Sequence, residues 1–200
     1  MTAQQALDIL MEGNRRWVDG RLAHPNRSVE RRQGLADAQR PFATVFSCID
    51  SRVPPEIVFD CGIGDLAVIR TGAHVLDDDV VMASLQFAAG VLQTPLMLVL
   101  GHQGCGAVTA AIDALEGRAS ADATLSPIVD ALRPAHDTLP PAPESANAED
   151  RIDRMVKAQT QLTVRAVAQA PMIAARVRGG DLQIVGGYYS FHTGAVSILD

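Results

Sequence analysis

The sequence predicts an α/β fold, a mostly parallel central sheet of about four strands with an antiparallel edge strand and helices on both faces. Two patterns support this fold class. Short apolar runs typical of buried strands alternate with longer segments of helical periodicity along the 200 residues. The last two strand-like segments are joined by a short turn, which favours antiparallel pairing. No linker or internal repeat interrupts the chain, so we expect residues 1–200 to form a single domain.

Composition and charge are typical of an ordinary globular protein. Apolar residues make up 48% of the chain and charged residues 20%, which argues against disorder. The net charge is −6 and no long basic run occurs, so we expect no nucleic-acid partner. The chain shows neither a secretory signal pattern nor an apolar run long enough to cross a bilayer. We therefore expect a cytoplasmic protein without a membrane partner, whose three cysteines are thiols or metal ligands rather than disulfides.

Two helices are predicted before the first strand. Residues 3–18 place apolar side chains at helical spacing, and Gly20 follows as a stop signal. A shorter helix, capped by Asn26 or Ser28, is expected to extend to Ala38. The two segments together precede the first apolar run that has strand character.

Strand character recurs in five segments, which we expect at residues 42–47, 66–70, 96–100, 182–189 and 195–199. Pro41 opens the first of these strands, at a position where no backbone donor is needed. Residues 191–194 are expected to form the turn of the final pair. This turn agrees with a sheet whose last strand is antiparallel to its neighbour.

The segments between the strands predict helices that start at Pro54, run from the acids at 77–79 to Leu92, run from near Gly104 to Gly117, and run from Glu149 to Arg178. Pro171 is expected to kink or split the last of these helices. An irregular loop is predicted over residues 119–143 because of Pro134, Pro140, Pro141 and Pro143.

Two polar clusters follow the first and third predicted strands. Cys48-Ile49-Asp50-Ser51-Arg52 ends the first strand, and His102-Gln103-Gly104-Cys105 ends the third. The carboxyl ends of parallel strands share one edge of a sheet, where α/β proteins build their ligand sites. If the first and third strands are neighbours, the two clusters meet at that edge.

The residue types of these clusters predict a zinc site. Cys48, His102 and Cys105 supply two thiolates and an imidazole, and a catalytic zinc has three protein ligands and one position for water or substrate. Asp50 has two alternatives: it binds zinc as a conditional fourth ligand, or it pairs with Arg52 through two hydrogen bonds. Zinc(II) with two thiolates and a neutral imidazole is neutral, so an added carboxylate would make the site less suited to activating water.

Other candidate ligands have no comparable constellation. Cys61 follows Asp60 without further ligand types at useful spacing, so we interpret it as structural. Surface or capping roles are expected for the remaining histidines, His24, His74, His136 and His192.

The pair of motifs Cys-x-Asp-Ser-Arg at 48–52 and His-x-x-Cys at 102–105 resembles that of the beta-class carbonic anhydrases. The similarity runs nearly from end to end, and its further matches are Gly13 to Trp17, Val53 to Glu56, Gly64-Asp65, Val68 to Thr71, Gly186 to Tyr189 and Thr193-Gly194. The paired motifs are specific enough that a chance match is not a reasonable explanation.

The resemblance implies a ligand set and a catalytic pair. Zinc would bind Cys48, His102 and Cys105, and Asp50 and Arg52 would form the gating and catalytic pair. It further implies a homodimer or homotetramer in which a projecting N-terminal helix packs on a neighbouring subunit.

Three substrate-binding residues also rest on the resemblance. Gln39 matches a glutamine that the partner subunit lends to the active site, and Phe87 matches an aromatic residue that lines the substrate pocket. The amide of Gly106 matches a backbone donor near the metal. From the sequence pattern alone, Phe87 is a core helix residue and Gln39 a polar surface residue.

The function expected from the residues and the resemblance together is reversible hydration of carbon dioxide to bicarbonate and a proton. One alternative keeps the site and changes the substrate to carbonyl sulfide or carbon disulfide. The other is a non-catalytic protein that binds zinc or bicarbonate. The presence of both Asp50 and Arg52 favours an enzyme, because a purely structural zinc site needs no such pair.

Overall fold

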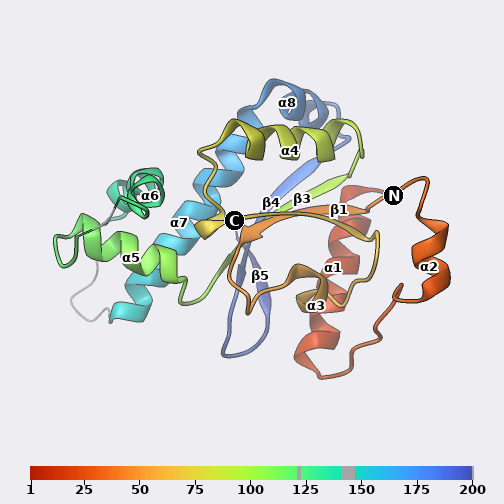
Figure 1. The fold of residues 1–200 in the computed structure, drawn as a ribbon, viewed down its shortest axis with the longest axis horizontal. Helices are drawn as coiled ribbons and strands as arrows, with labels where there is room; N and C mark the ends of the chain where they lie inside the picture. Colours follow the sequence, from red (N-terminus) through yellow and green to blue (C-terminus); the bar gives the residue numbers. More distant parts are fainter. Residues whose placement is uncertain (121–122, 141–146, 200) are drawn as a thin grey trace.

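A five-stranded sheet organises the chain in the computed structural model, which describes residues 1–120, 123–140 and 147–199 (Figure 1). The strand order is β2-β1-β3-β4-β5, and every neighbouring pair is parallel except β4 with β5. The strands are β1 (Ala43–Cys48), β2 (Leu66–Thr71), β3 (Leu96–His102), β4 (Gln183–Tyr189) and β5 (Val196–Leu199). The predicted mostly parallel sheet, its antiparallel edge strand and the adjacency of the first and third strands are confirmed.

Two helices precede the first strand, and the others lie between strands as an α/β fold requires. They are α1 (Ala3–Val18), α2 (Val29–Gly34), α3 (Pro55–Val58), the 3₁₀ turn η1 (Gly72–His74), α4 (Asp79–Gly90), α5 (Gly106–Leu115), α6 (Ser126–Thr138), α7 (Ala148–Gln169) and α8 (Pro171–Arg178). Pro171 splits the last long helix as predicted, because it occupies the first position of α8, where a missing N–H costs no hydrogen bond. Among the described residues, no helix combines the length and apolar character that a membrane span requires.

Alternation along the central strands divides the core between the two faces of the sheet. Val45 packs with α1 and α3, whereas the next residue, Phe46, packs with α4, α7 and α8. Figure 1 shows the same division, with α4 and α8 on one side of the sheet and α1 and α3 on the other. Helices α5, α6 and α7 enclose a third apolar cluster beside the carboxyl end of the sheet.

The N-terminal helix packs on the sheet of its own chain rather than projecting from it. Ala6 and Leu10 are fully buried in the cluster that contains α3 and β3. The Asn14 side chain donates to the carbonyls of Val58 at 3.1 Å and Gly194 at 3.0 Å, and accepts from the Val196 amide at 2.8 Å. The expectation of a projecting helix is therefore wrong for this chain, because one face of α1 packs against the core of its own chain and hydrogen-bonds to it.

Close contact between α1 and the end of α3 makes position 13 sensitive to size. A Cβ on Gly13 would lie 1.8 Å from the carbonyl oxygen of Phe59. We expect Gly13→Ala to lower the free energy of unfolding by about 3 kcal/mol, since the two backbones must separate. Gly34→Ala is the control, because its Cβ would meet nothing within 4 Å. Urea unfolding at one protein concentration measures both, and equal stability of the two variants would contradict the prediction.

The loop predicted over residues 119–143 is wrong where the structure describes it, because α6 occupies much of that range. Pro127 lies in the first turn, which tolerates proline, and the helix continues through Pro134. Val129, Leu132 and Ala135 are buried at helical spacing, so packing outweighs the local effect of Pro134. Pro141 and Pro143 fall outside the described residues.

The second helix is shorter than predicted. It is capped by the Ser28 side chain, which accepts from the Arg31 amide at 3.1 Å, and it ends at Gly34 instead of Ala38. Asn26 is not the cap, because its side-chain amide donates to both carboxylate oxygens of Asp65. The remaining predicted elements differ from the observed ones by a few residues at their ends.

Candidate metal centre

Two neighbouring parallel strands deliver the first two candidate ligands to one edge of the sheet. Cys48 is the last residue of β1, and His102 is the last residue of β3. The turn after β3 passes through Gly104, whose φ of +58° lies in the left-handed region that glycine adopts without strain. This turn returns the chain to Cys105, which precedes α5. Sequence-distant side chains thus meet as the two motifs predict.

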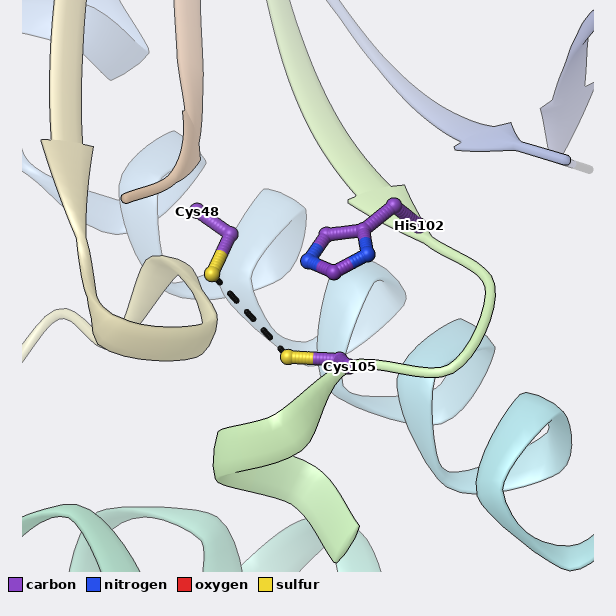
Figure 2. Close-up of side chains that lie close together, drawn as sticks. All are labelled: Cys48, His102 and Cys105. Atoms are coloured by element: carbon purple, nitrogen blue, oxygen red, sulfur yellow. Dashed lines mark hydrogen bonds between the residues drawn. The ribbon is translucent and has the colours of Figure 1, made fainter. Parts of the chain in front are cut away.

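The ligand atoms of Cys48, His102 and Cys105 all lie within 4.8 Å of one another, and all three residues are buried. Figure 2 shows the imidazole facing the two sulfurs. The sulfurs are 4.0 Å apart and belong to free cysteines. Zinc–sulfur bonds of about 2.3 Å in a tetrahedron place two sulfurs about 3.8 Å apart. The spacing therefore fits a zinc ion bound between the sulfurs.

The hydrogen bonds of His102 leave one ring nitrogen free for a metal. Nδ1 lies 2.9 Å from the carbonyl oxygen of Gln103, which only accepts, so Nδ1 carries the proton. Nε2 is buried and has no hydrogen-bond partner among the described residues. A buried nitrogen lone pair without a partner is costly, and coordination to a metal satisfies it.

The sulfur of Cys48 lies among donors that favour its thiolate. The Cys105 sulfur lies within hydrogen-bond distance, at 4.0 Å, and this contact lowers the pKa of Cys48. The Ala73 amide also donates to the sulfur at 3.3 Å. Ala73 lies in η1, where its φ of 49° and the 46° of His74 form a tight left-handed turn. These contacts provide the deprotonated sulfur that a metal requires.

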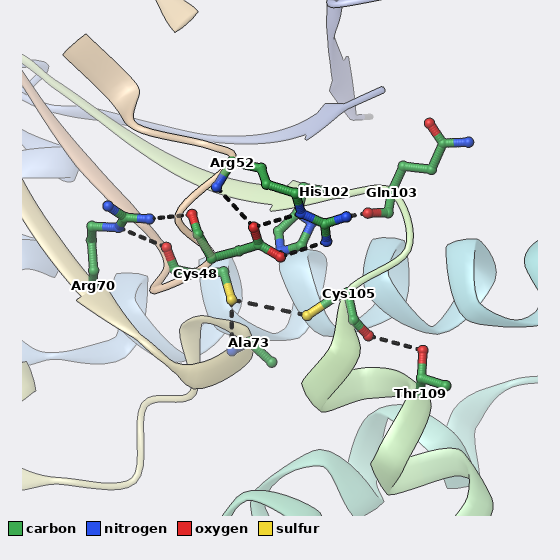
Figure 3. Close-up of polar contacts among 9 residues, drawn as sticks. Cys48, Arg52, Arg70, Ala73, His102, Gln103, Cys105 and Thr109 are labelled. Atoms are coloured by element: carbon green, nitrogen blue, oxygen red, sulfur yellow. Dashed lines mark hydrogen bonds and ion pairs between the residues drawn. The ribbon is translucent and has the colours of Figure 1, made fainter. Parts of the chain in front are cut away.

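The Asp50 carboxylate is paired with Arg52, which lies beside His102 and the two cysteines in Figure 3. Arg52 Nε donates to Oδ1 at 2.9 Å, a terminal nitrogen donates to Oδ2 at 2.7 Å, and the Arg52 amide donates to Oδ1 at 3.0 Å. These bonds hold the pKa of Asp50 at about 2. Oδ2 also lies 3.9 Å from His102 Nε2. Of the two alternatives for Asp50, the structure contains the pair with Arg52, with the carboxylate next to the ligand cluster.

Arg70 secures the backbone that carries Cys48 and Asp50. Its Nε donates to the Cys48 carbonyl at 2.7 Å, and a terminal nitrogen donates to the Asp50 carbonyl at 2.6 Å. Arg70 lies on β2, opposite Ser47 of β1. The parallel pairing of β1 with β2 was the signal that could have identified this contact from the sequence.

Phe191 also lies near the site, although the sequence predicts it only as part of a turn. Its ring centroid lies 4.3 Å from Arg52 Cζ and 5.6 Å from the centroid of the His102 ring. β4 pairs in register with β3, so Tyr189 lies opposite His102. Phe191 is two residues after Tyr189, and this spacing is the signal that could have placed Phe191 at the site.

The three residues assigned from the resemblance lie at different distances from the cluster. Gly106 begins α5 directly after Cys105, and a Cβ there would meet nothing within 4 Å. Gln39 is exposed before β1, at the opposite end of that strand from Cys48. Phe87 is 52% exposed on α4 and lines a cavity of about 620 Å³ between α4 and β2. The prediction that Phe87 is a core residue is wrong, since α4 leaves it at the surface beside an edge strand.

The other cysteine and the other histidines are separate from the cluster. Cys61 is buried, its thiol donates to the Phe59 carbonyl at 3.4 Å, and burial raises its pKa to about 12. His24 and His192 are exposed, and His136 is half-buried. His74 corrects the surface prediction: it is 1% exposed, its Nε2 lies 3.2 Å from Thr160 Oγ1, and burial lowers its pKa to about 4. It is buried because η1 turns the chain beneath the end of β1.

This fold and cluster define an α/β protein in which three buried residues are positioned to bind a metal, with the residue types that catalytic zinc sites use. The family profile described as carbonic anhydrase matches residues 43–196. Carbonic anhydrase 2 of Mycobacterium tuberculosis is 39% identical over 197 residues, which cover 96% of this chain and 90% of that protein. A carbonic anhydrase of Mycolicibacterium smegmatis is 40% identical over 189 residues, which cover 94% and 89%.

Solved structures agree with the sequence relatives. The Coccomyxa beta-carbonic anhydrase in complex with acetazolamide superposes with a TM-score of 0.76 at 28% identity, covering 96% of this chain and 86% of that one. A beta-carbonic anhydrase from Sordaria macrospora, described as tetrameric, shares the fold with a TM-score of 0.74 at 19% identity, covering 98% and 97%. The chain belongs to the beta carbonic anhydrase family, whose members are zinc enzymes, lyases that act on carbon dioxide.

Proposed function

We propose that this enzyme catalyses the zinc-dependent reversible hydration of carbon dioxide to bicarbonate and a proton. The observation that carries the proposal is the division of roles at the site. Three buried ligand atoms converge, while Arg52 engages the nearest carboxylate, that of Asp50. A site with three ligands and a diverted carboxylate retains a position for water, which a structural site does not need.

The proposed metal ligands are Cys48, His102 and Cys105. Zinc bound by them supplies the Lewis acidity that makes water nucleophilic near neutral pH. Two thiolates and one imidazole balance the charge of the ion, whereas a fourth ligand from Asp50 would add a negative charge. The pairing of Asp50 with Arg52 therefore supports an active arrangement of the site.

Asp50 and Arg52 are the proposed catalytic pair. Asp50 is ionised because of its bonds to Arg52, and its Oδ2, 3.9 Å from His102 Nε2, is placed to accept a hydrogen bond from a water molecule or substrate beside the ligand atoms. Arg70 donates to the carbonyls of Cys48 and Asp50, and so holds the backbone that carries the carboxylate beside the ligands. The exposed start of α5 at Gly106 leaves an amide available to a substrate oxygen.

We also propose a homodimer or homotetramer, in which Gln39 and Phe87 of one subunit contribute to the active site of its partner. The β2–α4 face supports this: the edge strand β2 and exposed Val80 and Phe87 line its apolar cavity. An apolar face beside an unpaired strand edge suits a second copy of the chain. Sedimentation of the zinc-loaded protein tests this, and a monomer at every concentration would contradict it.

Residues 1–200 are proposed to form one domain, because the helices pack on a single continuous sheet. Limited proteolysis that released a stable fragment would contradict this proposal.

A cytoplasmic location is proposed from the three free cysteines, which a reducing compartment maintains. Fractionation that placed the protein outside the cytoplasm would contradict this proposal.

The substrate is tested by assaying the same zinc-loaded sample with carbon dioxide, carbonyl sulfide and carbon disulfide. We expect carbon dioxide hydration to be the fastest reaction. Faster turnover of either sulfur compound would assign the site to that substrate. Zinc binding without turnover of any of the three would indicate a non-catalytic binding protein.

A further inference from the structure

An aromatic ring supports the Arg52 guanidinium at the edge of the metal centre. Phe191 follows β4, and its ring centroid is 4.3 Å from Arg52 Cζ, well inside the range of a cation–π contact. The same ring meets the His102 imidazole at an interplanar angle of 67°. Phe191 thus contacts both a candidate ligand and the arginine that pairs with Asp50.

Contacts behind the ring fix its position. The rings of Tyr189 and Phe191 meet edge to face, with centroids 5.4 Å apart and an interplanar angle of 88°. Tyr189 is 4% exposed, and its hydroxyl accepts from Trp17 Nε1 of α1 at 3.3 Å. Phe191 itself packs against the same apolar cluster. The core therefore holds the ring in place, and the ring offers the exposed Arg52 side chain a fixed surface.

Arg52 needs this support because its side chain is 59% exposed. Exposed ion pairs hold a geometry only weakly, since water competes for both partners and a long side chain loses rotamer freedom. The two side-chain bonds to Asp50 fix the guanidinium along one edge. The ring adds a flat surface 4.3 Å from Arg52 Cζ, and planar guanidinium groups pack well on such surfaces.

We propose that Phe191 is a positioning residue, whose ring holds Arg52 in the geometry that pairs with Asp50 and so keeps that carboxylate beside the ligand atoms. Its effect on rate rests on the proposed function, whereas the contact with Arg52 does not. Phe191 acts through Arg52, so removing Arg52 should also remove the effect of the ring.

Three substitutions isolate the ring. Phe191→Leu keeps an apolar side chain and loses the ring, while Phe191→Tyr keeps the ring. Phe42→Leu is the matched control: Phe42 packs against the same apolar cluster but precedes β1, at the end remote from the site. Zinc content is measured for every variant, so that rates are compared per metal-loaded site.

Hydration kinetics give the first readout. Phe191→Leu is expected to lower kcat/KM roughly two- to fivefold, the effect of losing one exposed cation–π contact. Phe191→Tyr should recover most of the rate, and Phe42→Leu should leave it unchanged. In an Arg52→Ala background, Phe191→Leu should cause no further loss. The same factor in both backgrounds would show a general structural role and overturn the proposal.

A nuclear magnetic resonance signal gives a second readout that needs no turnover. The Nε–H signal of Arg52 is identified by its loss in Arg52→Lys. It should shift in Phe191→Leu, because the ring no longer shields it, and stay in place in Phe42→Leu. An unchanged signal in Phe191→Leu overturns the proposal. If the wild-type enzyme fails to hydrate carbon dioxide, the proposed function fails, and this signal still tests whether Phe191 contacts Arg52.

Discussion

Cys48→Ser is expected to lose both bound zinc and carbon dioxide hydration. The serine hydroxyl is a poor zinc ligand at neutral pH, and the variant leaves Cys105 and His102 as an incomplete set. Zinc affinity should fall by more than about 100-fold, and the rate should fall with it. Metal analysis after dialysis and stopped-flow hydration on the same sample measure the two effects.

Cys61→Ser is the control for this prediction. It makes the same change at a buried cysteine that contacts the Phe59 carbonyl and lies outside the ligand cluster. The control should retain zinc and activity even if the protein is somewhat less stable. Stoichiometric zinc and near-normal hydration in Cys48→Ser would remove Cys48 from the ligand set.

Asp50→Ala is expected to keep zinc bound and to lower kcat/KM by about 100-fold or more. The three proposed ligands remain, so the metal stays. Arg52 loses the carboxylate that accepts its two side-chain hydrogen bonds, and the site loses its nearest acceptor. Metal analysis and hydration kinetics on one sample separate binding from turnover.

Asp113→Ala controls for the loss of an aspartate–arginine pair as such. Asp113 pairs with Arg118 at 2.8 Å on α5 and the turn that follows it, where both side chains are partly exposed. This variant should hydrate carbon dioxide at the normal rate. If Asp50→Ala were fully active over about pH 6–9, Asp50 would have no catalytic or gating role.

The sheet was predictable because its strands are strongly apolar and end at clear signals. Leu96 to Leu100 is a continuous apolar run, and β3 is buried along its whole length. The meeting of the two motifs followed from parallel pairing once the first and third strands are neighbours, an adjacency that the strand order confirms and the sequence does not fix. The helix α6 was not predictable from local signals, because Pro134 locally disfavours a helix. The tertiary packing of Val129 and Leu132 stabilises the helix and is not visible in the sequence.

Side-chain surroundings within the site were harder to predict than the ligand set. The two motifs bring chemistry-bearing residue types together in the sequence, so Cys48 and Cys105 stand out. Arg70 reaches the same place from β2 and Phe191 from the turn after β4, and neither belongs to the two ligand motifs in the sequence. His74 was misplaced for a related reason, because a left-handed turn at Ala73 buries it and no glycine at that position signals the turn.

The dependence of hydration rate on zinc content tests whether bound zinc is what enables this enzyme to hydrate carbon dioxide. The wild-type protein is stripped of metal with a chelator, reloaded with increasing zinc, and assayed by stopped-flow hydration at each measured zinc content. We predict that the rate rises in proportion to bound zinc and stops rising at one zinc per chain, as expected for one three-ligand site in each subunit. Full hydration by the stripped protein, or one bound zinc per chain without hydration, would show that this site is not a catalytic zinc centre.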